Sequence, residues 1–203
     1  MKRFFLILIL ITMITAVNSQ TQRSVKDAHG LSIGAKAPLF MAQDAHNSTF
    51  NLEKELQKKP VVLIFYRGFW CPVCNKHLGS IQDSLSMIEA TGAKVIAISP
   101  EKPDYLNKMA KKTGAEFTLL YDEGYRIANA YDVTFKPTST QLFTYNVILG
   151  AGLKKTHSDD SQQLPIPATF IIGRDGIIRW RQFNPDYKKR ASVKDILKAL
   201  DKL

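Results

Sequence analysis

One stretch of this sequence constrains the fold more than any other, because a short apolar run passes directly into two closely spaced cysteines. The run Val61–Tyr66 is continuous, β-rich and too short for a helix, so it predicts a strand buried on both faces. The cysteines follow in Trp70-Cys71-Pro72-Val73-Cys74. Apolar residues then recur at helical spacing, at Leu78, Ile81, Leu85 and Ile88, which predicts a helix that continues to Thr91-Gly92.

This junction of strand and helix indicates redox chemistry at the cysteines. Pro72 suits the first turn of a helix, which places Cys71 at the helix N-terminus and Cys74 one turn further on. Unpaired N–H groups and the helix dipole favour a thiolate there, and such motifs lower a cysteine pKa from about 8.5 to roughly 3.5–7.5. The second sulfur is in reach to resolve a mixed disulfide or a sulfenic acid.

Other uses of the two cysteines are disfavoured. A disulfide between them would close only a very small loop and would stabilise the fold little. Haem attachment needs a histidine directly after the second cysteine, where the sequence has Asn75. A structural zinc site needs four ligands, and only His77 lies near the pair. We therefore predict no metal and no cofactor, and we interpret His77 as an exposed helix residue.

The beginning of the chain has the pattern of a secretory signal peptide. Lys2 and Arg3 precede an almost wholly apolar stretch, and small residues stand at the cleavage positions before Gln20. A membrane anchor is the alternative, but the run is short against the roughly 20 residues that a span needs. We predict a signal peptide over residues 1–19, an exported protein in the periplasm or outside the cell, and membrane contact only through an uncleaved leader.

The basic excess of the chain does not indicate a nucleic-acid partner. The sequence has 28 Lys and Arg residues against 18 Asp and Glu residues, spread over pairs such as Lys58-Lys59 and Lys111-Lys112. Aromatic residues do not interleave with these pairs in the manner of a base-stacking surface. We interpret them as a solvated basic surface.

Between residues 34 and 203, alternating strands and helices predict one α/β domain with a partly parallel sheet. Residues 20–33 are polar and are expected to form a flexible lead-in. Residues 132–164 are expected to form an insertion before the last two strands. The remaining expected elements are two short strands within 34–52 around a turn at 44–48, a helix at 52–57, strands at 94–99, 117–120, 168–172 and 177–182, and helices at 103–112, 123–131 and 192–203.

From about residue 34 onward the chain resembles the peroxiredoxin-like branch of the alkyl hydroperoxide reductase / thiol-specific antioxidant family. The residues that carry the resemblance are Ala37–Phe40, Val62–Cys74, Leu164–Trp180, Asn184–Tyr187 and Arg190. The resemblance implies a thioredoxin-like fold, with a central mixed sheet flanked by helices and an N-terminal strand hairpin. It also implies an antioxidant thiol oxidoreductase that takes electrons from a thiol donor. We expect a thioredoxin-like donor or, because export would separate the protein from cytosolic thioredoxin, a membrane-relayed one.

The chain departs from the usual peroxiredoxin pattern around the cysteines. Peroxiredoxins place Pro, Thr and the attacking Cys after this strand, and an Arg on a later strand. Counted from Phe65-Tyr66, the first three positions hold Arg67, Cys71 and Cys74, and the later Arg position holds Pro167. The thioredoxin pattern is complete in the cysteine motif and Pro167, but its buried acid is replaced by Ile64.

Two supporting residues keep two interpretations each. Pro167 is either an ordinary proline at a strand start or, as in thioredoxin-like folds, a cis proline that faces the cysteine pair, and the resemblance favours the cis form. Arg67 either stabilises a thiolate or a polarised peroxide by charge-assisted hydrogen bonds, or is a surface arginine. Trp70 and Pro72 complete the predicted site.

The function that we predict is peroxide reduction through a dithiol–disulfide cycle of Cys71 and Cys74. Under the thioredoxin pattern Cys71 attacks and Cys74 resolves, and under the peroxiredoxin register the roles are reversed; exposure at the helix end favours Cys71. The first alternative is a thiol–disulfide oxidoreductase that acts on protein disulfides. The second is a non-enzymatic exported binding protein with a structural disulfide.

Overall fold

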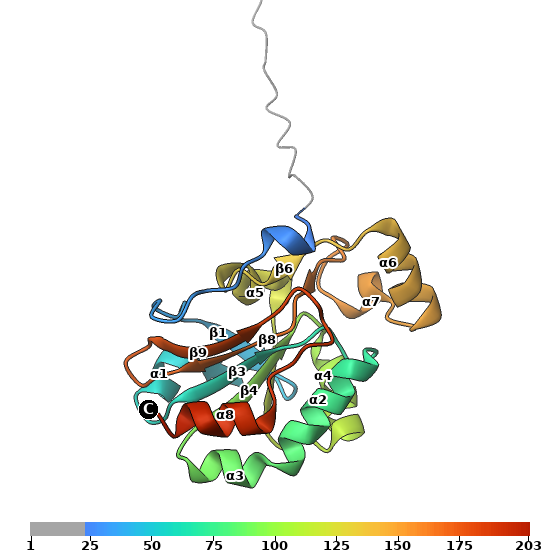
Figure 1. Cartoon of the computed structure of the whole chain (residues 1–203). Coiled ribbons are helices and arrows are strands. Elements are labelled where there is room, and N and C mark those ends of the chain that lie inside the picture. The colour runs from blue at the N-terminus through green and yellow to red at the C-terminus, as the bar shows by residue number, and fades with distance from the viewer. Residues whose placement is uncertain (1–22) are drawn as a thin grey trace, which may run out of the picture.

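A seven-stranded mixed sheet organises the computed structural model, which describes residues 23–203 (Figure 1). Its strand order is β2-β1-β5-β4-β3-β8-β9, and a separate pair is formed by β6 and β7. The strands are β1 (Met41–Asp44), β2 (Thr49–Asn51), β3 (Val61–Phe65), β4 (Lys94–Ser99), β5 (Thr118–Tyr121), β6 (Thr134–Phe135), β7 (Leu164–Pro165), β8 (Ala168–Ile172) and β9 (Ile178–Phe183). The predicted thioredoxin-like architecture with a central mixed sheet is confirmed.

The register of the central strands determines where the cysteines lie. Strand β3 is parallel to β4, and β4 is parallel to β5, so their carboxyl ends share one edge of the sheet. Strand β8 is antiparallel to β3 and pairs Ala168 with Phe65. The end of β3, which leads into the cysteine motif, therefore meets the start of β8 and the residues that precede it.

Helices cover both faces of the sheet. The helices are α1 (Leu52–Leu56), α2 (Pro72–Asp83), α3 (Leu85–Ala90), α4 (Pro103–Thr113), α5 (Arg126–Ala130), α6 (Ser139–Phe143), α7 (Leu153–Thr156) and α8 (Val193–Leu200), with 3-10 turns η1 (Val25–Asp27) and η2 (Glu123–Tyr125) and a π-helical turn η3 (Thr144–Ile148). Buried side chains of α2, α3, α4 and α8 pack on one face, and those of α1 and α5 pack on the other. Within residues 23–203, no helix has both the length and the apolar character required to cross a membrane.

Two predicted boundaries are wrong. The long helix expected after the cysteines is divided into α2 and α3 at Ser84, whose φ of −116° and ψ of 11° are not helical. The first hairpin strand begins at Met41, because the preceding segment pairs elsewhere: Lys36 forms an isolated bridge with Ile177, and the Ala37 N–H donates to the Gly176 carbonyl.

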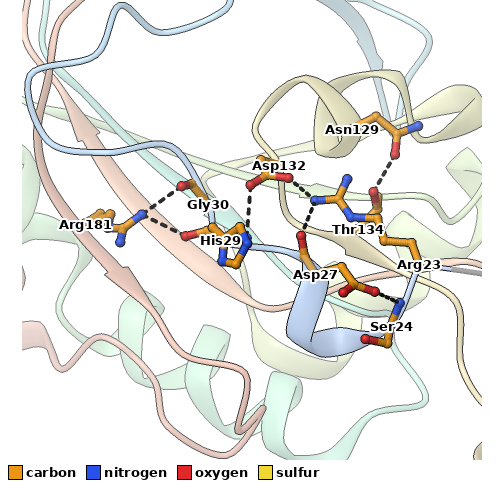
Figure 2. A network of polar contacts seen from close by, with 9 residues as sticks. All are labelled: Arg23, Ser24, Asp27, His29, Gly30, Asn129, Asp132, Thr134 and Arg181. Carbon is orange, nitrogen blue, oxygen red and sulfur yellow. Dashed lines mark hydrogen bonds and ion pairs between the residues drawn. The ribbon is translucent and has the colours of Figure 1, made fainter.

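The segment expected to be a flexible lead-in is bonded to the domain in its described part (Figure 2). Arg23 forms an ion pair with Asp132, and the His29 N–H donates to the same carboxylate at 3.0 Å. Arg181 donates to the carbonyls of His29, Gly30 and Leu31, at 2.9 Å each. The expectation of flexibility is therefore wrong for residues 23–33, and the predicted signal peptide over residues 1–19 lies outside the described residues.

The insertion between residues 132 and 164 has its own local structure. It contains β6, α6, η3, α7 and β7, and the β6–β7 pair closes its two ends. Tyr145 of η3 is buried, and its ring lies 5.2 Å from the ring of Trp70. The insertion thus packs against the cysteine motif.

Candidate functional site

The two cysteines lie at the start of α2, as the sequence predicts. Cys71 is the N-cap residue, Pro72 occupies the first turn, and the Cys74 N–H donates to the Cys71 sulfur at 3.4 Å. Both sulfurs are reduced, and both residues are fully buried. The expected exposure of Cys71 is therefore wrong. Since that exposure was the reason to favour Cys71 as the attacking sulfur, it no longer supports that assignment.

Arg67 is a buried part of this site, so its interpretation as a surface arginine is wrong. Its side chain is 2% exposed, and its Nη2 donates to the Cys71 sulfur at 3.1 Å. Three aromatic rings surround the guanidinium: the ring of Tyr187 lies at 4.1 Å, that of Tyr145 at 5.1 Å and that of Trp70 at 5.2 Å. Cation–π attraction in this desolvated environment compensates part of the cost of burying the charge.

A second arginine, Arg190, contacts the other sulfur. Its Nη2 donates to Cys74 at 3.5 Å, and its Nε donates to the Tyr187 carbonyl at 2.6 Å. Arg190 lies in the loop between β9 and α8 and was absent from the predicted site residues, although it is among those that carry the family resemblance. Peroxiredoxins place an arginine on a later strand, where this chain has Pro167. Arg190 supplies a guanidinium to the site in its place.

The charges and burial around the sulfurs shift the two cysteine pKa values in opposite directions. Burial opposes ionisation of Cys74, but the thiol of Cys71 and the charges of Arg190 and Arg67 outweigh it and hold the pKa of Cys74 well below its usual value. The pKa of Cys71 is raised, first because its thiol donates to Cys74 and second by burial. Arg67 and the Cys74 N–H both donate to the Cys71 sulfur, and Arg67 opposes this rise in the pKa of Cys71.

Pro167 lies near this site, but its peptide bond is trans. Residues 23–203 contain no cis peptide bond, so the expected cis form is wrong. The chain enters β8 in an extended form because the Ile166 N–H donates to the Val133 carbonyl at 2.6 Å and β7 pairs with β6. Pro167 and Tyr145 help to line a cavity of about 40 Å³ beside Arg67.

His77 is buried, which corrects its interpretation as an exposed residue. Its Nε2 lies 3.0 Å from the Ala191 carbonyl oxygen, and this contact ties α2 to the loop that carries Arg190. Burial, together with the charge of Arg190, lowers the pKa of His77 to about 4. The ring is therefore neutral around pH 7, and it positions Arg190 without adding a charge to the site.

Glu101 is a buried carboxyl group beside the site that is not among the predicted site residues. It follows the end of β4, and its Oε2 accepts the Phe69 N–H at 2.8 Å. Burial, assisted by the charge of Cys74, raises its pKa to about 8 against the opposing effects of the Phe69 N–H and Lys108. A signal was present in the sequence, because parallel neighbouring strands bring their carboxyl ends to one edge.

Gly68 permits this packing, and its replacement by alanine is expected to disrupt the site. A Cβ there would lie 2.5 Å from both Glu101 Oε1 and Trp70 Nε1. Overpacking of this kind costs about 1–3 kcal/mol, so we expect Gly68→Ala to lower the midpoint of thermal unfolding. Gly79→Ala in α2 is the control, because a Cβ at Gly79 has open space; equal midpoints for the two variants would contradict the packing argument.

Comparisons with known proteins identify the family of the chain and agree with its fold. The model of the AhpC/TSA family matches residues 33–181. The chloroplastic peroxiredoxin Q of Populus jackii is 26% identical over 191 residues, which cover 93% of this chain and 78% of that protein. Its counterpart from Triticum aestivum is 27% identical over 173 residues, 85% of this chain and 68% of that protein. The crystal structure of peroxidoxin BcpB from Mycobacterium tuberculosis superposes with a TM-score of 0.66 at 19% identity, covering 85% and 98% of the two chains.

Proposed function

Since the chain belongs to the AhpC/TSA family, we propose that it is a thiol-dependent peroxidase whose cycle uses Cys74 as the attacking sulfur and Cys71 as the resolving sulfur. One feature carries the assignment of roles: each sulfur accepts from its own arginine, and the surroundings lower the pKa of Cys74 while they raise that of Cys71. This arrangement holds a thiolate on Cys74 and a thiol on Cys71. The Cys74 thiolate is the form that attacks, and the Cys71 thiol brings the proton that leaves with water in the second step.

The proposed cycle has three steps. The Cys74 thiolate attacks one peroxide oxygen, so that an S–O bond forms and the O–O bond breaks. The departing oxygen takes up a proton and leaves as an alcohol or water. The sulfur of Cys71 then attacks the sulfenic acid of Cys74, which forms the disulfide and releases water with the proton of Cys71. A thiol donor returns two electrons and restores both cysteines by thiol–disulfide exchange.

The two arginines fit the electrostatic demands of the first step. Negative charge passes from sulfur to the departing oxygen, and cationic donors that face this position stabilise the transition state. The Nη1 of Arg190 and the Nε of Arg67 are buried and have no partner among the described protein atoms. Their free donors, and the small cavity beside Arg67, suit a small peroxide such as hydrogen peroxide.

The compartment of the protein determines which electron donor can reduce its disulfide. We propose that the protein is exported, on the strength of the basic and apolar pattern of residues 1–19. A thioredoxin-like domain outside the cytoplasm, or one that receives electrons across the membrane, would then reduce the disulfide. Expression of the full chain followed by cell fractionation and N-terminal sequencing tests the compartment.

Stopped-flow mixing of the reduced protein with hydrogen peroxide tests the activity. We expect the tryptophan fluorescence to change at least about a hundredfold faster than a free thiol is oxidised, because the charged donors stabilise the transition state. A rate equal to that of a free thiol would contradict the peroxidase proposal. If oxidation by peroxide is that slow and the protein nevertheless catalyses the reduction of a protein disulfide, the result would support the alternative function, a thiol–disulfide oxidoreductase.

A further inference from the structure

Peroxide reduction at this site needs one proton that neither sulfur supplies. The Cys74 thiolate brings no proton to the first step, and the proton of Cys71 leaves with water in the second. The oxygen that departs in the first step still has to be protonated. The site is buried, so a protein group close to Cys74 is a better source than bulk solvent.

We propose that Glu101 holds this proton, being protonated while Cys74 is a thiolate and ionised once the disulfide has formed. The inference rests on the proposed dithiol cycle and deepens it. Glu101 is completely buried at the carboxyl end of β4, beside the turn that leads into the cysteine motif. The Phe69 N–H holds one carboxyl oxygen at 2.8 Å, which fixes the group in place.

The other carboxyl oxygen has no fixed partner. Glu101 Oε1 and Trp70 Nε1 are both buried without a hydrogen bond among the described protein atoms, and both lie within 2.5 Å of the point where a Gly68 Cβ would stand. An acceptor and a donor thus flank the same small space next to the cysteine motif. Buried polar groups nearly always have a hydrogen-bond partner, and those that lack one often have a catalytic role.

The charges around Glu101 support the exchange. Its pKa is raised first by burial and also by the negative charge on Cys74, while Lys108 on α4 lowers it. The negative charges of Glu101 and of Cys74 both raise the pKa of Tyr66, so the two groups influence the same part of the protein interior. His157 pairs with Glu101 through the backbone only, because its ring bonds to Tyr125.

Other buried groups near Cys74 do not suit the role. His77 has a pKa of about 4 and is already neutral at pH 7, so it carries no proton to release as an acid. Burial raises the pKa of Tyr66 well above its usual value. The arginines keep their protons throughout. Glu101 is the group whose pKa, about 8, lies close to neutrality in the reduced state.

The exchange balances in atoms, charge and electrons. A thiolate, a thiol and a carboxylic acid react with one peroxide to give a disulfide, a carboxylate, an alcohol and water. The two sulfurs lose two electrons and the peroxide gains them. The single negative charge of the buried site moves from Cys74 to Glu101, and the loss of the sulfur charge lowers the pKa of the carboxyl group in the oxidised form.

Exchange with a reference dithiol across a range of pH tests the proposal without measuring peroxidase activity. Dithiothreitol binds two protons on reduction below the thiol pKa of about 8.5. The wild-type site also binds two, one on Cys71 and one on Glu101, so its exchange constant should stay level between about pH 6 and 7.5. Glu101→Gln binds only one, so its constant should rise tenfold per pH unit, which corresponds to about 30 mV.

The matched control is Asp122→Asn. Asp122 is also a buried carboxyl with a raised pKa, but no cysteine contributes to its surroundings, and it accepts from the backbone N–H groups of α5. Its exchange constant should stay level, as in the wild type. A tenfold slope in the wild type, or a level constant in Glu101→Gln, would overturn the role of Glu101.

Infrared difference spectra of the wild type provide a second measurement that needs no variant. Reduction at pH 7 should produce a protonated carboxyl band that is absent from the oxidised protein, and its absence would overturn the proposal. Either failure, with fast peroxide oxidation intact, leaves the proposed function standing. Oxidised protein without a Cys71–Cys74 disulfide would overturn the cycle and the proton exchange together.

Discussion

Cys74→Ser is expected to abolish fast oxidation by hydrogen peroxide, whereas Cys71→Ser is expected to retain the first oxidation and stop at the sulfenic acid. The reason is the distribution of charge: Arg190, Arg67 and the Cys71 thiol stabilise a thiolate on Cys74, and only the thiolate is a strong nucleophile. In Cys74→Ser, burial opposes ionisation of the remaining thiol. Stopped-flow fluorescence gives the rates, and mass spectrometry after dimedone treatment identifies the sulfenic acid.

The pair of variants also decides between the two patterns in the motif. Cys71→Ser preserves the N-cap, because a serine oxygen can accept the Cys74 N–H, so it changes the fold little. Its hydroxyl can also donate to the thiolate of Cys74, so we expect its oxidation rate to fall by less than about tenfold. Fast formation of a sulfenic acid on Cys71 in the Cys74→Ser variant would contradict our assignment and restore the thioredoxin pattern.

The cysteine site could be predicted from the sequence because its core is local. A buried strand, a proline in the first helical turn and two cysteines three residues apart determine the arrangement whatever surrounds them. The burial of Arg67 could not be read in the same way. Its aromatic neighbours Tyr145 and Tyr187 come from the insertion and from the loop after β9, and no local pattern indicates that these segments meet.

The errors in the prediction have the same origin. The lead-in is fixed by Asp132 and Arg181, which lie more than a hundred residues away along the chain. The resemblance implies a cis form of Pro167, whereas the β6–β7 pair of the insertion keeps the chain extended and the peptide bond is trans. Glu101 was the avoidable omission, since a carboxyl group just beyond β4 must lie near the end of β3.

Arg190→Gln is expected to slow peroxide oxidation at pH 7 on the order of a hundredfold, the usual cost of removing one charged or oxyanion-stabilising donor. Arg190 is the guanidinium in contact with Cys74, and its loss raises the pKa of that thiol. A raised pKa removes thiolate at low pH first, so part of the rate should return as the pH rises. The loss of rate that remains at high pH, where Cys74 is fully ionised, measures how much Arg190 stabilises the departing oxygen in the transition state.

The sign and size of this effect distinguish Arg190 from the other arginines. The Arg67 side chain bonds to Cys71 and acts on Cys74 through its charge, and the backbone N–H of residue 67, which also lowers the pKa of Cys74, is kept in Arg67→Gln. This variant should therefore slow the reaction less than Arg190→Gln. Arg181→Gln is the control, because within residues 23–203 the hydrogen bonds of the Arg181 side chain go to the carbonyls of residues 29–31 and its cation–π partner is Phe183, so its loss should leave the rate unchanged. An unchanged rate in Arg190→Gln, or a larger loss in Arg67→Gln, would show that Cys71 carries the reactive charge, because each arginine acts most strongly on the sulfur that it contacts.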